Sequence, residues 1–190
     1  SESPESLEIP EPPDSPYDTI TEYDPNTFIA RTTMLTGMDS LEIYYEFPFF
    51  PASAGGNASL NENFLELRNE FFRDETTLIA RALDYAQTPF AGDLYYLTYT
   101  CSIDTFNEEI TSIHLKGSWY MGGVISGMTP AYTFDTSTGK QLSLPDVLPC
   151  SIAEYQEYLN QAVRDDGIED YANLSGDTTQ CSFYILDDAI

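Results

Sequence analysis

The segment from Trp119 to Leu148 constrains the fold most, because it holds two strand signals separated by residues that favour turns. The first strand signal ends at Tyr120. Three glycines follow, Gly122, Gly123 and Gly127, and glycine enters positive φ without a steric cost. Residues 132–136 then resume the alternation of side chains that is typical of a strand. We therefore predict two strands joined by a glycine-rich loop.

The sequence DTSTGK at residues 135–140 predicts a tight hairpin turn. Asp and Ser side chains accept hydrogen bonds from their own backbone in turns, and Gly139 can take the left-handed position of a bulged hairpin. Leu142 and Leu144 continue the alternation after the turn. Pro145 is expected to end it, because proline has no donor for the ladder.

Periodicity in the rest of the chain predicts an α+β fold, an antiparallel sheet with two main helices packed against it. The other expected strands cover residues 27–50, 94–103, 109–120 and 182–186. A long helix is expected over 59–87, with Ser59 and Glu62 as a capping box, and a second over 151–163, with Ser151 and Glu154. One apolar stripe of the long helix should face the core: Leu60, Phe64, Leu67, Phe71, Leu78 and Ala82.

Residues 1–26 are rich in Ser, Pro and Glu and offer little apolar surface to bury. Such a composition is typical of a disordered or extended segment. We expect a spacer that follows a membrane anchor upstream of residue 1; a remnant without a role is the alternative. The remaining residues, 27–190, are enough for a single folded domain.

The charge of the chain restricts its partners. Acidic side chains number 32 against 7 basic ones, for a formal net charge of -25. Nucleic acid is excluded as a direct partner, because phosphate binding requires a basic surface. No run approaches the roughly 20 apolar residues of a membrane span, so membrane insertion by this segment is not expected. A cationic partner would be attracted; the alternative is that the acidity serves solubility alone.

No catalytic, metal or cofactor site is predicted. The single histidine, His114, lies mid-strand on a polar face, and no GxSxG motif is present. Acidic pairs such as Asp165-Asp166 are frequent only because the whole chain is acidic, and the DxDxDG spacing of a calcium loop is missing. The cysteines fit no close-spaced zinc pattern. We therefore do not expect an enzyme.

Three cysteines permit one disulfide and a free thiol, or no disulfide. Cys101 shares a strand face with apolar residues, so we expect it to be buried and reduced. Cys150 and Cys181 flank the second expected helix at element ends, where pairing needs less distortion. We predict a disulfide between these two residues, since export favours oxidation.

Short motifs in the central segment, in this order and spacing, resemble a bacterial extracytoplasmic domain. They are Tyr120-Met121-Gly122-Gly123, Tyr132-Thr133-Phe134-Asp135, Thr138-Gly139-Lys140 and the run from Leu142 to Leu148. The domain occurs in RsiV-type anti-sigma factors that sense lysozyme, and as a non-catalytic region of some peptidoglycan deacetylases and lipoproteins. The resemblance extends more weakly over residues 33–190 and implies the same α+β layout.

The sequence departs from that family at two places. The family usually has Thr at the position of Met121 and Ala-His at Val124 and Ile125, so any contact made by that histidine is absent. The family's domain also continues with further strands beyond the equivalent of Ile190, which predicts a C-terminally incomplete domain.

The resemblance implies an exported, non-catalytic binding or sensing domain at the cell envelope, with a cationic protein such as a lysozyme as its partner. A cell-wall glycan is the alternative ligand. The candidate binding residues are Tyr120, Gly122, Gly123, Ser126 and Tyr132, a surface loop with aromatic flanks on a rigid sheet. The alternative is that these glycines only shape the backbone and the tyrosines only pack.

Overall fold

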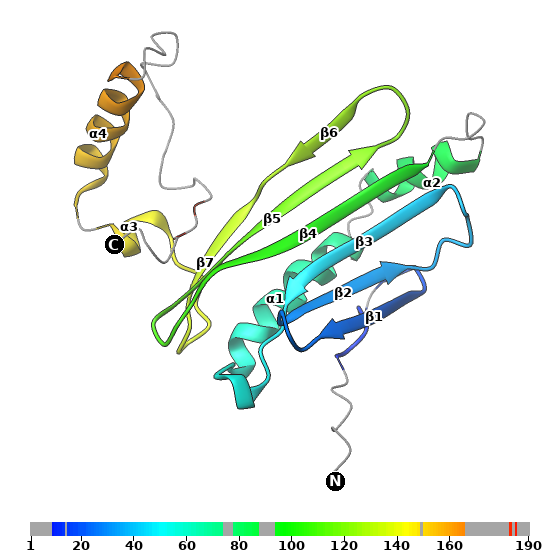
Figure 1. Cartoon of the computed structure of the whole chain (residues 1–190), viewed down its shortest axis with the longest axis horizontal. Coiled ribbons are helices and arrows are strands. Elements are labelled where there is room, and N and C mark those ends of the chain that lie inside the picture. Colours follow the sequence, from blue (N-terminus) through cyan, green and yellow to red (C-terminus); the bar gives the residue numbers. More distant parts are fainter. Residues whose placement is uncertain are drawn as a thin grey trace.

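The structure is a computed structural model that describes residues 9–13, 15–73, 78–87, 94–148, 150–165, 183 and 185. Within this part of the chain seven strands form one sheet: β1 (Thr19–Asp24), β2 (Ile29–Met34), β3 (Leu41–Pro48), β4 (Tyr95–Phe106), β5 (Ile110–Tyr120), β6 (Ile125–Met128) and β7 (Ala131–Asp135). The strands follow the order β1-β2-β3-β4-β5, and both β6 and β7 pair with the free edge of β5 (Figure 1). All pairs are antiparallel except β3 and β4. The predicted α+β class is confirmed.

The helices that pack on the sheet lie between β3 and β4 in the chain. They are α1 (Ala58–Arg73) and α2 (Leu78–Gln87), preceded by the short helix η1 (Ala52–Ala54), and they cover one face (Figure 1). The predicted stripe is confirmed: Leu60, Phe64 and Ala82 are buried in the core. They pack against alternate residues of β3, which share one face of the strand: Leu41, Ile43, Tyr45 and Phe47.

The long helix predicted over 59–87 is thus two helices, and residues 74–77 lie outside the described part of the chain. Its predicted capping box is also wrong, because Asn57 Oδ1 accepts the hydrogen bond from the Leu60 amide at 2.7 Å. The Asn side chain reaches the third residue after it, which is the usual geometry of a helix N-cap.

Two helices follow the sheet among the described residues. Leu144 does not continue a strand but begins α3 (Leu144–Val147), where Pro145 occupies the first turn and Ser143 pairs with Asp146 in a capping box. Proline suits that position because the first helical amides have no partner within the helix. The second predicted helix is α4 (Ile152–Asp165), and its predicted Ser151–Glu154 capping box is confirmed. In Figure 1, α4 stands away from the sheet, so α2 rather than α4 is the second helix on the sheet.

The predicted extent of the N-terminal spacer is wrong for residues 19–24. These residues form β1 and pair along their whole length with β2, because their backbone groups complete the edge of the sheet. Residues 9–12 also contact the domain: Ile9 packs against the core, and the buried Arg68 side chain donates a hydrogen bond to the Pro10 carbonyl at 2.5 Å. Residues 1–8 lie outside the described range.

Most of the strand predicted at 182–186 lies outside the described residues. Phe183 and Ile185 are described, and both have their backbone held by side chains of the sheet. The Ile185 amide donates to Ser112 Oγ at 2.8 Å, and Thr105 Oγ1 donates to the Ile185 carbonyl at 2.6 Å. Ser112 Oγ also bonds to Thr133 Oγ1 of β7 at 3.0 Å, so Ile185 adds a second partner to a hydroxyl that the sheet already binds.

The DTSTGK turn forms as predicted, and it is docked on the start of α1. The Gly139 amide donates to the Asp135 carbonyl at 2.8 Å, and Gly139 has a φ of 74°. Asn63 of α1 donates to the Gly139 carbonyl at 2.8 Å, and Asn57 donates to the Thr136 carbonyl. The two asparagines therefore join segments that are far apart in the sequence.

Two glycines allow the docking of this turn to be measured separately from backbone strain. Gly139 and Gly37 both have positive φ, but a Cβ on Gly139 would lie 2.7 Å from the Leu60 amide nitrogen, whereas a Cβ on Gly37 would meet nothing within 4 Å. We expect Gly37→Ala to lower the free energy of unfolding by about 1–2 kcal/mol, the cost of the left-handed conformation. Gly139→Ala should lose about 1–3 kcal/mol more through overpacking. Urea denaturation measures both, and equal losses would contradict the docking.

Candidate functional site

Four of the five candidate residues lie at the tip of the β5–β6 hairpin. Tyr120 ends β5 and pairs with Ile125 of β6, and the turn between them holds Gly122 and Gly123 at φ values of 90° and 96°. Ser126 follows in β6 and is exposed. Gly122 and Gly123 therefore interrupt the strands as the sequence predicted, since these φ values are costly for any residue with a Cβ. The prediction is wrong for Gly127, which lies within β6 and pairs with Ser118.

Tyr132 does not lie at this tip. Tyr132 lies on β7 and pairs with Ile113 of β5. Ile113 is seven residues from Tyr120 along β5, a distance of roughly 23 Å at the rise of a strand. The expectation that Tyr120 and Tyr132 flank one loop is wrong, because β7 pairs with the opposite half of β5. The five candidate residues thus divide between two places on the sheet.

The first place is a row of side chains across the face of the sheet that lies away from α1 and α2. We call it the tyrosine row, and its members are direct neighbours across four strands: Glu42 of β3, Tyr96 of β4, Tyr120 of β5 and Ile125 of β6. Glu42 is exposed, the two tyrosines are half-buried, and Ile125 is 64% exposed. The row offers apolar ring area, two hydroxyls and a carboxylate to solvent.

Ring contacts hold the tyrosine row in place. The centroids of Tyr96 and Tyr120 lie 6.2 Å apart with the rings inclined by 33°, and Tyr120 also stacks on the buried Tyr95 at 6.1 Å. Contacts of this kind contribute roughly 0.5–1.5 kcal/mol beyond burial. Sequence reasoning missed Tyr96 and Glu42, although both alternate with apolar residues along their strands. That alternation was the available signal.

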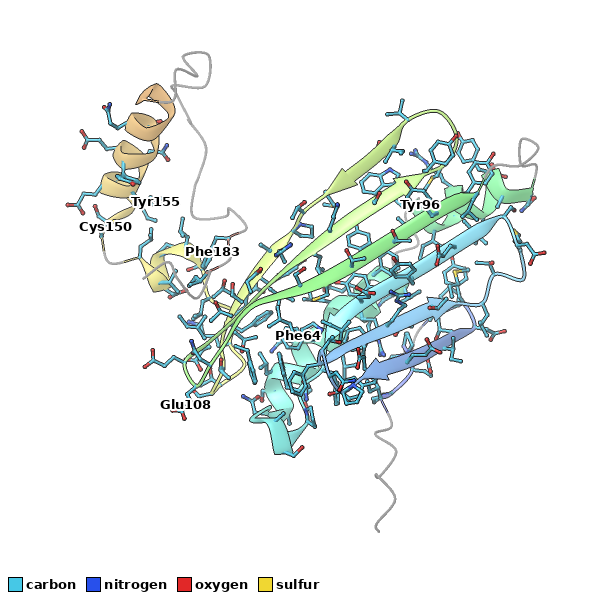
Figure 2. The ribbon with its side chains drawn as sticks, in the orientation of Figure 1. Phe64, Tyr96, Glu108, Cys150, Tyr155 and Phe183 are labelled. Carbon is cyan, nitrogen blue, oxygen red and sulfur yellow. The ribbon has the colours of Figure 1, made fainter. Side chains whose placement is uncertain are left out.

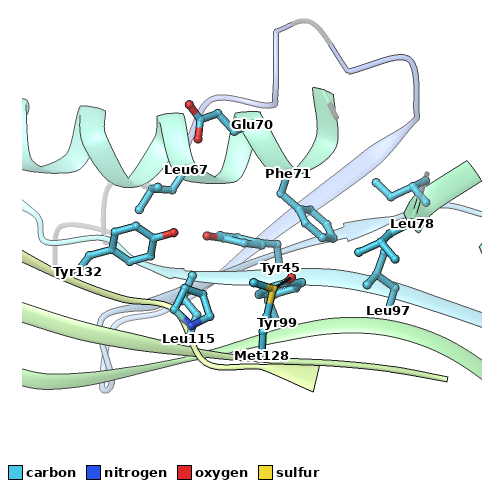
Figure 3. Close-up of a pocket in the computed structure, with 12 residues that line it drawn as sticks. Tyr45, Leu67, Glu70, Phe71, Leu78, Leu97, Tyr99, Leu115, Met128 and Tyr132 are labelled. Carbon is cyan, nitrogen blue, oxygen red and sulfur yellow. Dashed lines mark hydrogen bonds between the residues drawn. The ribbon is translucent and has the colours of Figure 1, made fainter. Parts of the chain in front are cut away.

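The second place is a pocket of about 260 Å³ between the sheet and α1, which holds Tyr132 (Figure 3). Tyr45 and Tyr99 of the neighbouring strands also line it. The Tyr99 hydroxyl donates to Met128 Sδ at 3.1 Å. Burial raises the pKa of all three tyrosines, so each remains a neutral phenol at physiological pH.

A larger hollow of about 1070 Å³ lies beside the DTSTGK turn, α3 and Tyr155 of α4. Two of its carboxylates are already bound locally. A hydrogen bond from Ser137 lowers the pKa of Asp135, and one from Ser143 lowers the pKa of Asp146. These hydrogen bonds stabilise a turn and a helix end.

His114 lies on the outer face of the sheet and is half-buried, with its Nδ1 2.9 Å from both carboxylate oxygens of Asp104. The sequence suggested that His114 faces solvent, whereas the structure places its ring against a carboxylate. Among the described residues, no three His, Cys, Asp or Glu side chains lie close enough to hold a metal ion. None of the described helices is long and apolar enough to span a membrane.

The predicted disulfide is not present at Cys150, which is a free and exposed thiol (Figure 2). Its proposed partner Cys181 lies outside the described residues. Cys101 is also free and packs against the core. Burial, aided by the carboxylates of Glu46 and Asp104, raises the pKa of the Cys101 thiol well above its ordinary value.

Comparison with known proteins gives a likeness of fold. No family model matches the sequence, and no curated protein matches it. A DUF3298 family protein from Pseudomonas aeruginosa has a similar structure, with a TM-score of 0.50 and 14% identity over 85% of this chain and 71% of that one. A DUF3298 family member from Bacteroides fragilis gives a TM-score of 0.44 and 16% identity over 83% and 67%. The structural neighbours therefore come from a bacterial domain family, and at such identity the first supports the fold alone.

The two described cysteines should differ in reactivity. The thiolate is the nucleophile, and Cys101 remains a protonated thiol. We expect iodoacetamide at about pH 8 to modify Cys150 at least about tenfold faster than Cys101 in the folded protein. Peptide mass spectrometry gives both rates in one sample. Equal modification rates of the two cysteines in the folded protein would show that Cys101 is not protected. As the control, the two rates should become equal when the protein is unfolded in guanidinium.

Proposed function

We propose that this chain is an exported, non-catalytic binding domain of the bacterial cell envelope, which captures a cationic protein on the tyrosine row. The observation that carries the proposal is the tyrosine row itself, with Tyr96 and Tyr120 open to solvent between Glu42 and Ile125, in a chain of net charge -25. The resemblance to RsiV-type domains suggests a lysozyme as the partner, and the DUF3298 fold is compatible with a bacterial domain of this kind.

The chemistry of the row suits a basic protein surface. Tyrosine is enriched at protein interfaces because its ring supplies area and its hydroxyl a hydrogen bond. Arginine and lysine of a partner can stack on such rings, as Arg31 already does on Tyr44, with its guanidinium carbon 4.3 Å from the ring centroid. Glu42 can pair with a second cation, and the overall negative charge accelerates the encounter.

A cell-wall glycan is the second candidate, because neighbouring tyrosine rings also suit stacking on sugars. The inclined pair formed by Tyr96 and Tyr120 is the observation that favours it. The two ligands differ in salt dependence. Attraction between charges weakens as the Debye length falls from about 10 Å at 0.1 M salt to about 3 Å at 1 M, whereas stacking on a sugar hardly changes.

Binding of a basic lysozyme, measured by calorimetry at about 0.1 M and 1 M salt, tests the proposal. We expect the affinity to fall at least about tenfold at the higher salt. Tyr96→Ser and Tyr120→Ser should each cost about 1–2 kcal/mol at the lower salt, as interface aromatics do. Tyr158→Ser is the matched control, because Tyr158 is 71% exposed on α4, away from the row.

Thermal unfolding of each variant separates loss of binding from loss of fold. Folded row variants with unchanged affinity would place the lysozyme site elsewhere on the chain. Binding of a chitin or peptidoglycan oligosaccharide that is insensitive to salt, together with no binding of lysozyme, would favour the glycan. If neither ligand binds, the proposed function is wrong.

A further inference from the structure

A pocket lies between the sheet and the two helices that cover one of its faces. It is on the opposite face from the tyrosine row. Its floor comes from β3, β4 and β5, and its roof from Leu67 and Phe71 of α1 with Leu78 of α2 (Figure 3). Met128, 49% exposed, and the exposed Glu70 stand at its rim. At about 260 Å³ it is smaller than the roughly 300–1,000 Å³ of drug-sized ligand sites.

Two hydroxyls inside this pocket have hydrogen-bonding capacity that the described residues do not use. Tyr45 and Tyr132 point their hydroxyls toward each other (Figure 3), and neither makes a hydrogen bond to another described residue. The Tyr45 side chain belongs to the core, at 4% exposure. Both hydroxyl groups can therefore accept or donate a hydrogen bond to a guest in the pocket.

The charges around the pocket restrict what that guest can be. Glu70 is the one charged residue among the twelve that line it, and it lies on α1 above the two hydroxyls (Figure 3). The Glu70 carboxylate also contributes to the raised pKa of Tyr45 and Tyr132, which keeps both as neutral phenols. An anion would therefore meet repulsion without a compensating basic group, whereas a cation would meet attraction.

We infer that this pocket binds a primary ammonium group on a short apolar stem, either a free alkylamine or a lysine side chain. The ammonium has three donors, and it would donate to the Tyr45 and Tyr132 oxygens. The Glu70 carboxylate at the rim would attract its charge. The stem would pack on the apolar side chains of the walls, such as Leu67 and Leu115. The faces of the aromatic rings add attraction for the positive charge.

Three ligands of one size separate charge from shape: butylammonium, butanol and butyrate. Methyl NMR spectra of the folded protein would follow Met128, Leu67 and Leu115 during each titration. We expect butylammonium to shift these methyls and to bind at least about fivefold tighter than butanol, with no binding of butyrate. Equal binding of all three, or no saturable shift with butylammonium, would overturn the inference and leave a packing gap that holds only water.

Conservative variants test the residues. Tyr45→Phe and Tyr132→Phe retain the rings, and each should weaken butylammonium binding about three- to tenfold, the range for one lost hydrogen bond to a charged group. Glu70→Gln should weaken butylammonium about threefold and leave butanol unchanged, since Glu70 is exposed. Tyr158→Phe and Glu62→Gln are the matched controls, because neither residue lines the pocket. Unchanged affinity in all three pocket variants would refute the assigned site.

A further pair of ligands identifies the source of the ammonium. Nα-acetyl-lysinamide carries the same group on a peptide backbone, and its Nε-acetylated form lacks the charge. Binding of the first but not the second assigns the pocket to a lysine of a bound protein or peptide. If butylammonium binds and neither lysine derivative does, the guest is a free alkylamine. This inference is independent of the tyrosine row, so Tyr96→Ser should leave butylammonium binding unchanged.

Discussion

The parallel pairing of β3 and β4 is the constraint on which the rest of the structure depends. Parallel neighbours cannot be joined by a tight turn, so the chain must cross the sheet between them. Here the crossover consists of α1 and α2, whose apolar stripe is buried on one face. One connection therefore builds the core, covers that face and leaves the other face to solvent. Both candidate sites follow from this asymmetry.

The two faces carry different chemistry for that reason. On the open face, Glu42, Tyr96 and Tyr120 become neighbours only through the register of three strands. On the covered face, the helices stop short of the β6–β7 edge, and the gap exposes the hydroxyls of Tyr45 and Tyr132 to a small pocket. The net charge of -25 acts on both faces, because a strongly acidic chain favours cations wherever a partner approaches.

Long-range hydrogen bonds fix details that local patterns misassigned. Asn57 caps α1 and also donates to the DTSTGK turn, so the helix starts where that turn docks and not at the Ser59–Glu62 pattern. Residues 19–24 were assigned to a spacer because their neighbourhood is acidic and rich in proline, yet they complete the edge of the sheet beside β2. In both places the partner is distant in the sequence, so a pattern of neighbouring residues does not include it.

The sequence by itself determined the fold class, the apolar faces of α1 and β3, the glycine turn after Tyr120 and the hairpin at residues 135–140. Each of these rests on periodicity or on local backbone geometry, which neighbouring residues specify. Only the tertiary structure decided that Tyr132 lies beside Tyr45 and not beside Tyr120, and that Tyr96 joins the open-face row. Strand order and register bring distant residues together, and these depend on the burial of the whole chain rather than on any local pattern.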